Sequence, residues 1–198
     1  MQNQTYVDRL RPQIKKEALV YDILLVIGAS IFITLCAQIA FNVPFSPVPI
    51  TGQTFAVVLT GALLGSRRGG LAIIAYLLEG ISGLPVFAQA QFGIVHLVGP
   101  TGGYLIGFIP AAYLSGLLAE FGWGKTIFGA LGIMSVSTVI IFICGLSWLN
   151  IFFGNNNTLE LGLYPYLPGA VIKIVLAAVL FRLGWQVIDK YGKDEVEQ

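Results

Sequence analysis

Lys173 is the side chain whose position most needs a chemical explanation. It follows the motif LPG (residues 167–169) inside an apolar run that is long enough to cross a membrane. An unpaired ammonium within such a run costs on the order of several kcal/mol. Either the side chain reaches the outer headgroups, or it faces an internal, partly wet pocket and binds a carboxylate or carbonyl group. We expect the Lys173 side chain to face such a pocket.

Two further polar side chains are predicted near the same membrane face. Glu79 is close to the outer end of another apolar stretch, where it either pairs with Lys173 or reaches the membrane interface. His96 is the only histidine, and no carboxylate or cysteine stands near it at metal-ligand spacing. We therefore expect His96 to pack or to touch a ligand, and we predict no metal site.

Motifs for catalysis are missing. The chain has no GxxxxGK[ST] phosphate-binding loop, no nucleophile elbow, no HExxH pair and no inward-facing pair of carboxylates. It also offers no convincing nucleophile and base that could meet within a membrane. We predict that the protein is not an enzyme, uses no cofactor and cannot hydrolyse ATP by itself.

Composition places the chain in a membrane. Of 198 residues, 56% are hydrophobic and 11% are charged, whereas soluble domains carry about a quarter charged residues. No charge occurs between Asp22 and Arg67 or between Lys125 and Glu160, and roughly 20 apolar residues suffice to cross a bilayer. The net charge of +1 and the lack of a basic stripe argue against a nucleic-acid partner.

These runs predict an all-α membrane protein, a six-transmembrane-helix bundle with long outer loops. The second and third helices are short for spanning helices and are expected to tilt or bend. We expect a tail or surface helix at residues 1–19, a membrane domain at 20–190 and a second tail at 191–198. The six predicted helices cover residues 20–41, 54–65, 69–82, 103–121, 126–153 and 167–188.

The basic residues orient the bundle. Ten of the eleven fall before the first helix, between the second and third, between the fourth and fifth, or at the end of the sixth. The opposite loops, residues 42–53, 83–102 and 154–166, contain no Lys or Arg. By the positive-inside rule both termini are cytoplasmic in a multi-pass protein of the cell membrane, and only Lys173 breaks the rule.

The outer loops have an unusual composition for segments that connect helices. The first contains Pro44, Pro47 and Pro49 and is therefore expected to be extended and stiff. The second is long and apolar, which suggests that it folds back into the membrane, covers a cavity or simply packs on the bundle. We expect five aromatic residues to lie at the membrane interface or to pack, rather than to form pocket walls: Trp123, Trp148, Trp185, Tyr164 and Tyr166.

Several motifs in order give the chain a resemblance to a known family. They are PVPITGQT (47–54), LLG (63–65), GLPVFA (83–88), GPTGGY (99–104) and LPG (167–169) with Lys173. The set resembles the BioY family, the biotin-specific substrate-binding components of energy-coupling factor (ECF) transporters. The resemblance implies a six-helix fold that holds biotin near the outer face. It also implies uptake driven by two cytoplasmic ATPase subunits through a transmembrane coupling subunit.

The resemblance also suggests site residues. The family's lysine in the LPG motif falls on Lys173, and a polar ligand-binding loop residue falls on Gln91. We expect polar contacts from Lys173, Gln91 and Gln53, and apolar walls from Phe87 and Tyr104. A lysine among aromatic and aliphatic walls with a few amides suits biotin's carboxylate, ring system and ureido group.

One departure from the family pattern keeps alternatives open. An aspartate usually follows LPG, and here that position is Ala170. Its loss removes an acceptor for ureido N–H groups, although Gln91, Gln53 or Glu79 could substitute. The protein could instead bind another small carboxylated vitamin, or be a structural subunit of a membrane complex that binds no ligand. The small-residue pattern expected on the first helix for docking to the coupling subunit is also imperfect, with Ser30 and Thr34, or Cys36 and Ala40, as nearest matches.

Overall fold

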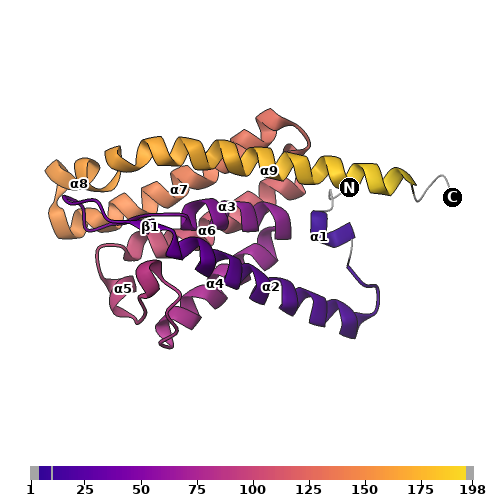
Figure 1. Ribbon diagram of the computed structural model, residues 1–198, viewed down its shortest axis with the longest axis horizontal. Helices are drawn as coiled ribbons and strands as arrows, with labels where there is room; N and C mark the ends of the chain where they lie inside the picture. Colours follow the sequence, from indigo (N-terminus) through magenta and orange to yellow (C-terminus); the bar gives the residue numbers. More distant parts are fainter. Residues whose placement is uncertain (1–4, 10, 195–198) are drawn as a thin grey trace.

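A computed structural model of the chain describes residues 5–9 and 11–194, which form an elongated bundle of helices (Figure 1). The α-helices are α1 (Tyr6–Arg9), α2 (Lys15–Gln38), α3 (Gln53–Leu64), α4 (Ser66–Ile81), α5 (Val95–Val98), α6 (Gly102–Glu120), α7 (Ile127–Phe153), α8 (Asn155–Gly162) and α9 (Leu167–Asp194). Two short strands, β1 (Ala40–Phe41) and β2 (Ile50–Thr51), and three 3-10 turns, η1 (Ala88–Ala90), η2 (Trp123–Lys125) and η3 (Tyr164–Tyr166), complete it.

Four helical segments in the described part of the chain are long and apolar enough to cross a membrane. They are Lys15–Gln38, Gly102–Glu120, Ile127–Phe153 and Asn157–Gly184. The helices α3 and α4 match the two short helices expected from the sequence, with 12 and 16 residues. The structure is thus mostly helical, as predicted, and these two short helices lie close to where the sequence placed them.

Helix boundaries differ from the prediction at several places. Helix α2 ends at Gln38 rather than at residue 41, and α9 continues to Asp194, beyond the predicted end at residue 188 and into the segment expected as a tail. The first long helix begins at Lys15 rather than at residue 20, so its first turn contains charged residues. Glu17 in that turn is favourable because a carboxylate stabilises the positive end of the helix dipole. The polar segment NNNTLELG, which lay in a predicted outer loop, forms α8. Thr158 Oγ1 donates to Gly154 O at 2.7 Å within that helix.

The first outer loop is held in one shape, as its prolines suggested. Strands β1 and β2 pair antiparallel, with Ala40 opposite Thr51 and Phe41 opposite Ile50. At the tip, Ser46 Oγ donates to Leu161 O at 2.6 Å. The hairpin is therefore fastened to α8, and it returns the chain directly into α3.

Helix α3 forms the centre of the bundle. Nine of its twelve residues are buried, and it touches α2, α4, α6, α7 and α9. A helix that is apolar on all sides suits either the core of a bundle or contact with lipid, and α3 takes the core position. Its small residues let neighbouring backbones approach closely, as membrane helices require. At Gly61 an added Cβ would lie 2.2 Å from Ala112 O on α6.

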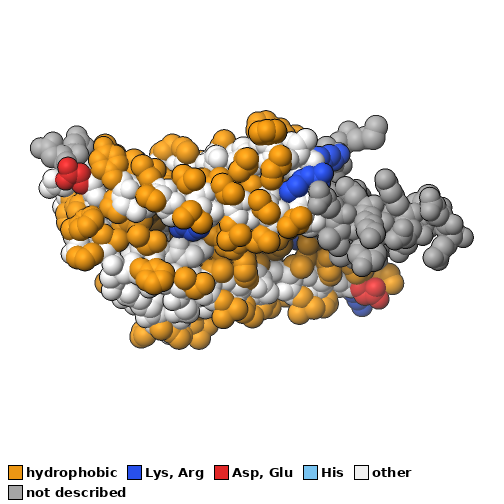
Figure 2. Space-filling view, turned by 45° about the horizontal axis from the view of Figure 1, so that its top comes forward, with side chains coloured by type: hydrophobic (Ala, Val, Ile, Leu, Met, Phe, Trp, Pro, Cys, Tyr) orange, Lys and Arg blue, Asp and Glu red, His pale blue; other side chains and the backbone are white. Residues whose placement is uncertain are grey.

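The outside of the bundle is apolar along its length (Figure 2). Large hydrophobic side chains are exposed on α2, α7 and α9, among them Leu24, Ile143 and Ile172. Contiguous apolar surface of this kind marks contact with a membrane or a partner. With the four segments long enough to span, this surface is what lipid would cover.

Charged side chains from α1, α2, α4 and the segment before α2 form one network at the end of the bundle where α1 lies (Figure 1). Arg68 donates to Asp8 and to Asp22 at 2.7 Å each, and Arg11 donates to Asp22 at 2.7 Å. Burial by itself would raise the pKa of Asp8, but hydrogen bonds from Thr5 and Arg68 outweigh it and lower that pKa. This network ties α1 to the start of α2 and to the junction of α3 and α4.

We predict that Gly61→Ala lowers the thermal unfolding midpoint of the detergent-solubilised protein. The added methyl group must push α3 away from α6, and overpacking of this kind costs about 1–3 kcal/mol. Gly28→Ala is the matched control, because Gly28 also lies within a helix and an added Cβ there meets nothing within 4 Å. Equal midpoints for the two variants would contradict the close approach of α3 and α6.

Candidate functional site

A cavity of about 400 Å³ lies at the end of the bundle opposite the chain termini. Its walls come from the first outer loop, the start of α3, the second outer loop, α6, α7 and the start of α9. All five residues predicted as site residues line it: Gln53, Phe87, Gln91, Tyr104 and Lys173. The two outer loops therefore cover a cavity. For the second loop, this was one of the alternatives that the sequence left open.

Lys173 faces this cavity rather than the membrane surface. Its ammonium donates to Thr51 O at 3.0 Å and to Thr54 Oγ1 at 2.8 Å. An ammonium has three N–H donors, so two are used and one is left for a ligand. The suggested ion pair between Glu79 and Lys173 is wrong, because Glu79 instead accepts a hydrogen bond from Ser30 Oγ at 2.5 Å.

The cavity carries one positive charge that no lining carboxylate offsets. Among the described residues that line it, Lys173 is the only Lys or Arg, and none is Asp or Glu. Ala170 lines the cavity one turn before Lys173 and is 6% exposed. An uncompensated cation in a partly apolar cavity favours an anionic guest.

The side chain of Gln53 forms two hydrogen bonds with neighbouring side chains. It accepts from Thr51 Oγ1 at 2.9 Å, and its amide nitrogen donates to Tyr76 Oη at 2.6 Å. Tyr76 in turn donates to Val86 O at 3.1 Å. Gln53 therefore connects the loop that holds Lys173 to the second outer loop, and it has one amide N–H left for a ligand.

Phe87 and His96 form one apolar wall. Phe87 is 2% exposed and meets Tyr76 and His96 edge-on, with ring centroids 5.6 and 6.0 Å apart. The ring fits because residue 80 is glycine, where a Cβ would lie 2.1 Å from Phe87 Cζ. His96 packs against Phe87 and lines the cavity.

Two tyrosines close the cavity on the side of α8. Tyr104, a predicted wall, is 8% exposed and donates to Gly162 O at 2.8 Å. Tyr166 is bonded to Ser46 Oγ at 2.7 Å and to Val48 O, and it also lines the cavity. The expectation that Tyr166 would not be a pocket wall was wrong. Its position directly before the LPG motif was the available signal.

The other predicted interfacial aromatics divide between surface and interior. Trp123 and Tyr164 are half exposed, as expected of interfacial residues. Trp148 donates to Gly99 O at 2.9 Å and packs against the second outer loop. The side chain of Trp185 lies outside the described residues.

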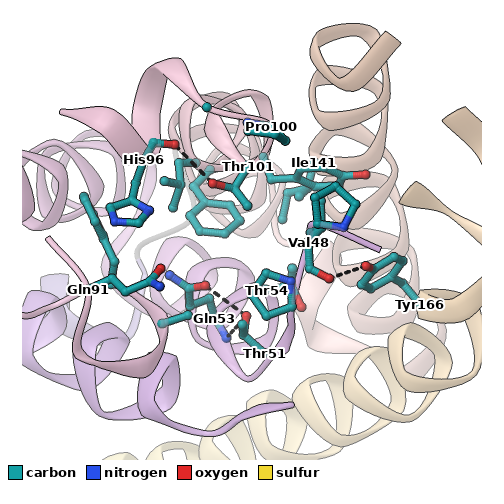
Figure 3. Close-up of a pocket in the computed structure, with 18 of the residues that line it drawn as sticks. Val48, Thr51, Gln53, Thr54, Gln91, His96, Pro100, Thr101, Ile141 and Tyr166 are labelled. Carbon is teal, nitrogen blue, oxygen red and sulfur yellow. Dashed lines mark hydrogen bonds between the residues drawn. The ribbon is translucent and has the colours of Figure 1, made fainter. Parts of the chain in front are cut away.

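The labelled polar side chains surround the cavity on several sides (Figure 3). Gln91 and His96 come from the second loop and lie on one side, and Val48 and Tyr166 lie on the other. Thr51, Gln53 and Thr54 line the wall between them. Thr51 and Thr54 were not predicted as site residues, and their place beside Gln53 in the motif PVPITGQT (47–54) was the available signal.

Comparison with known proteins gives consistent matches. The model of the BioY family matches residues 7–190. A "Biotin transporter BioY" from Thermotoga maritima is 40% identical over 160 residues, covering 78% of this chain and 91% of that protein. A "Probable biotin transporter BioY" from Pyrococcus horikoshii is 37% identical over 146 residues, covering 73% and 83%.

A solved structure also matches. It is a crystal structure of the S-component for biotin from an ECF-type ABC transporter, with a TM-score of 0.76 and 27% sequence identity. The match covers 83% of this chain and 90% of the other. The resemblance drawn from the motifs is confirmed, and so is the overall fold of such a component.

Tyr76→Phe tests the hydrogen bonds that join the two outer loops. Removing the hydroxyl leaves Val86 O and the Gln53 amide without a buried partner, which costs about 1–3 kcal/mol. We expect a lower thermal unfolding midpoint in detergent. Tyr113→Phe is the control, because Tyr113 is 48% exposed on α6. If the Tyr76→Phe protein is as stable as the Tyr113→Phe protein, the hydrogen bonds of Tyr76 do not hold the two loops together.

Proposed function

The chain belongs to the BioY family, and from this premise we propose that it captures biotin in the cavity described above. It acts as the membrane-embedded binding subunit of an ECF-type importer. The observation that carries the proposal is the ammonium of Lys173, which faces a cavity that contains no lining carboxylate among the described residues. The names of the relatives and of the matching structure support biotin as the ligand.

The chemistry of biotin fits this cavity group by group. Its carboxylate suits the free donor of Lys173, because charge-assisted hydrogen bonds are the strong ones. Its apolar ring system suits the walls formed by Phe87, Tyr104 and Tyr166. Its ureido group needs neutral donors and acceptors, which Gln91 and the second N–H of Gln53 supply. Few polar groups among apolar walls is the usual make-up of a small-molecule site.

The proposed arrangement is a six-span bundle in the cell membrane with both termini in the cytoplasm. Helices α2, α3, α4, α6, α7 and α9 are the six spans. The positive-inside rule supports this orientation, since Arg11, Arg67, Arg68 and Lys125 precede, join or follow helices at the same end. The cavity then opens toward the outside, where the vitamin is scarce and must be captured.

Energy for uptake must come from other subunits. The chain has no phosphate-binding loop, so a membrane coupling subunit and two cytoplasmic ATPase subunits are its expected partners. The matching structure is the S-component for biotin from an ECF-type ABC transporter, which supports this assignment. Co-purification with an ATPase pair from the native membrane is the direct check of this partner set.

We predict that Lys173→Met weakens biotin binding to the purified protein by about 30-fold or more. The substitution keeps the apolar stem but removes the charge, and loss of one partner of a buried charge pair costs about 2–5 kcal/mol. Arg67→Met is the control, since Arg67 is exposed at the opposite end of the bundle. Radiolabelled biotin measures the effect, and equal affinity in both variants would remove Lys173 from the site.

A second candidate ligand is another small carboxylated vitamin, which Ala170 favours because it offers no acceptor for ureido N–H groups. A displacement panel of biotin, biotinamide and unrelated carboxylated vitamins separates the two. We expect biotin to displace the label at the lowest concentration and biotinamide, which lacks the negative charge, to be at least about tenfold weaker. Displacement by a different vitamin at lower concentration would reassign the ligand, and no saturable binding at all would favour a structural subunit.

A further inference from the structure

The second outer loop makes an unusual turn where it covers the cavity. Gln89 and Ala90 have φ values of 59° and 57°, and they are the only non-glycine residues with positive φ in the described chain. The left-handed conformation is unfavourable for residues with a Cβ, and two in succession must be held by other contacts. The flanking residues Phe87, Ala88 and Gln91 line the cavity together with Gln89.

The contacts that hold this turn come from Gln38, the last residue of α2. Its amide nitrogen donates to Phe87 O at 3.2 Å, and its amide oxygen accepts from Ala90 N at 2.9 Å. One side chain thus bridges both ends of the strained turn. The same nitrogen also donates to Thr34 O at 3.2 Å, one turn earlier on α2, so the bridge is fixed in its own helix.

A second bond joins the turn to the same region. Gln89 Nε2 donates to Asn42 Oδ1 at 2.8 Å, and Asn42 directly follows strand β1. Both contacts therefore originate at the outer end of α2 and its continuation. The turn itself is closed by Phe87 N donating to Gln91 O at 3.0 Å, which alone does not explain two left-handed residues.

Helix α2 is less deeply buried than α3 and α6. Of its 24 residues, five are buried: Ala18, Ala29, Ser30, Ile33 and Ala37. Most of these are small, so the helix rests on the bundle through a narrow strip and exposes long apolar side chains on the other faces. A helix held by so little buried surface shifts more easily than α3 or α6.

We propose that Gln38 is a positioning residue that holds the strained turn closed over the bound ligand, so that the pocket wall opens when the outer end of α2 moves away. The proposal rests on the proposed function for the identity of the ligand. When α2 is in place, two hydrogen bonds offset the strain at Gln89 and Ala90. When α2 withdraws, the strain favours opening of the turn, and the walls formed by Phe87 and Gln91 separate from the ligand.

Kinetics of biotin binding test this role. In Gln38→Met, which removes both hydrogen bonds but keeps a side chain of similar length, we expect biotin to dissociate about tenfold faster with a nearly unchanged association rate. The control is Gln13→Met, because Gln13 is exposed before α2 at the opposite end. Equal dissociation rates in the two variants would overturn the proposal.

Relief of the strain provides a readout that a general loss of stability would not produce. Glycine adopts positive φ without penalty, so Ala90→Gly makes the turn less dependent on Gln38. In the Ala90→Gly background we expect Gln38→Met to speed dissociation by only about threefold or less. An undiminished effect of Gln38→Met in that background would show that strain in the turn is not what Gln38 opposes.

Hydrogen exchange separates failure of this proposal from failure of the proposed function. The Ala90 amide hydrogen is bonded to Gln38 Oε1, so its exchange should be faster in Gln38→Met than in Gln13→Met. This measurement needs no biotin. A wild-type protein that does not bind biotin refutes the ligand, whereas unchanged exchange at Ala90 refutes the role of Gln38.

Discussion

The structure depends on one ammonium group held inside an apolar bundle. Lys173 is tolerated there because Thr51 O and Thr54 Oγ1 accept two of its hydrogen bonds, and its charge is left for an anionic guest. These acceptors belong to the end of β2 and the first turn of α3. The hairpin, the central helix and α9 must therefore meet at one place, which explains why a stiff, proline-containing loop leads directly into the most buried helix.

A second constraint links the two outer loops. Gln53 connects Thr51 to Tyr76, and Tyr76 connects to Val86, so the surroundings of Lys173 and the position of Phe87 are coupled by buried hydrogen bonds. Such networks stabilise a structure only when every member is satisfied. The cavity is consequently a preformed site whose walls share one set of polar contacts, and its adjustable part is the turn at Gln89 and Ala90.

Much of this arrangement could be predicted from the sequence. Long apolar runs without charged residues predicted the long helices. In lipid, backbone N–H and C=O groups can form hydrogen bonds only within the helix itself. The cost of a charge in such a run pointed to Lys173 as a cavity residue. The family resemblance, which rests on the order of the motifs, led to the prediction of Phe87 and Tyr104 as cavity walls. The helix α8 was missed because its polar sequence NNNTLELG has no apolar periodicity, and its formation depends on contacts with α7 and η3.

Gln38 escaped prediction because its role depends on partners distant in the chain. Gln53 was expected among the polar contacts of the site, but its bond to Tyr76 was not. Both are glutamines beside apolar segments, yet Gln38 supports the turn over the cavity from outside and Gln53 lies within the cavity wall. Nothing local in the sequence indicates these bonds, since the amides meet their partners 23 and 52 residues away. Glu79 illustrates the same point: the sequence left either Lys173 or the membrane interface as its partner, whereas helix packing brings it to Ser30. Side-chain chemistry thus tells which residues need a partner, and only the packing of α2, α3 and α4 decides which partner each one finds.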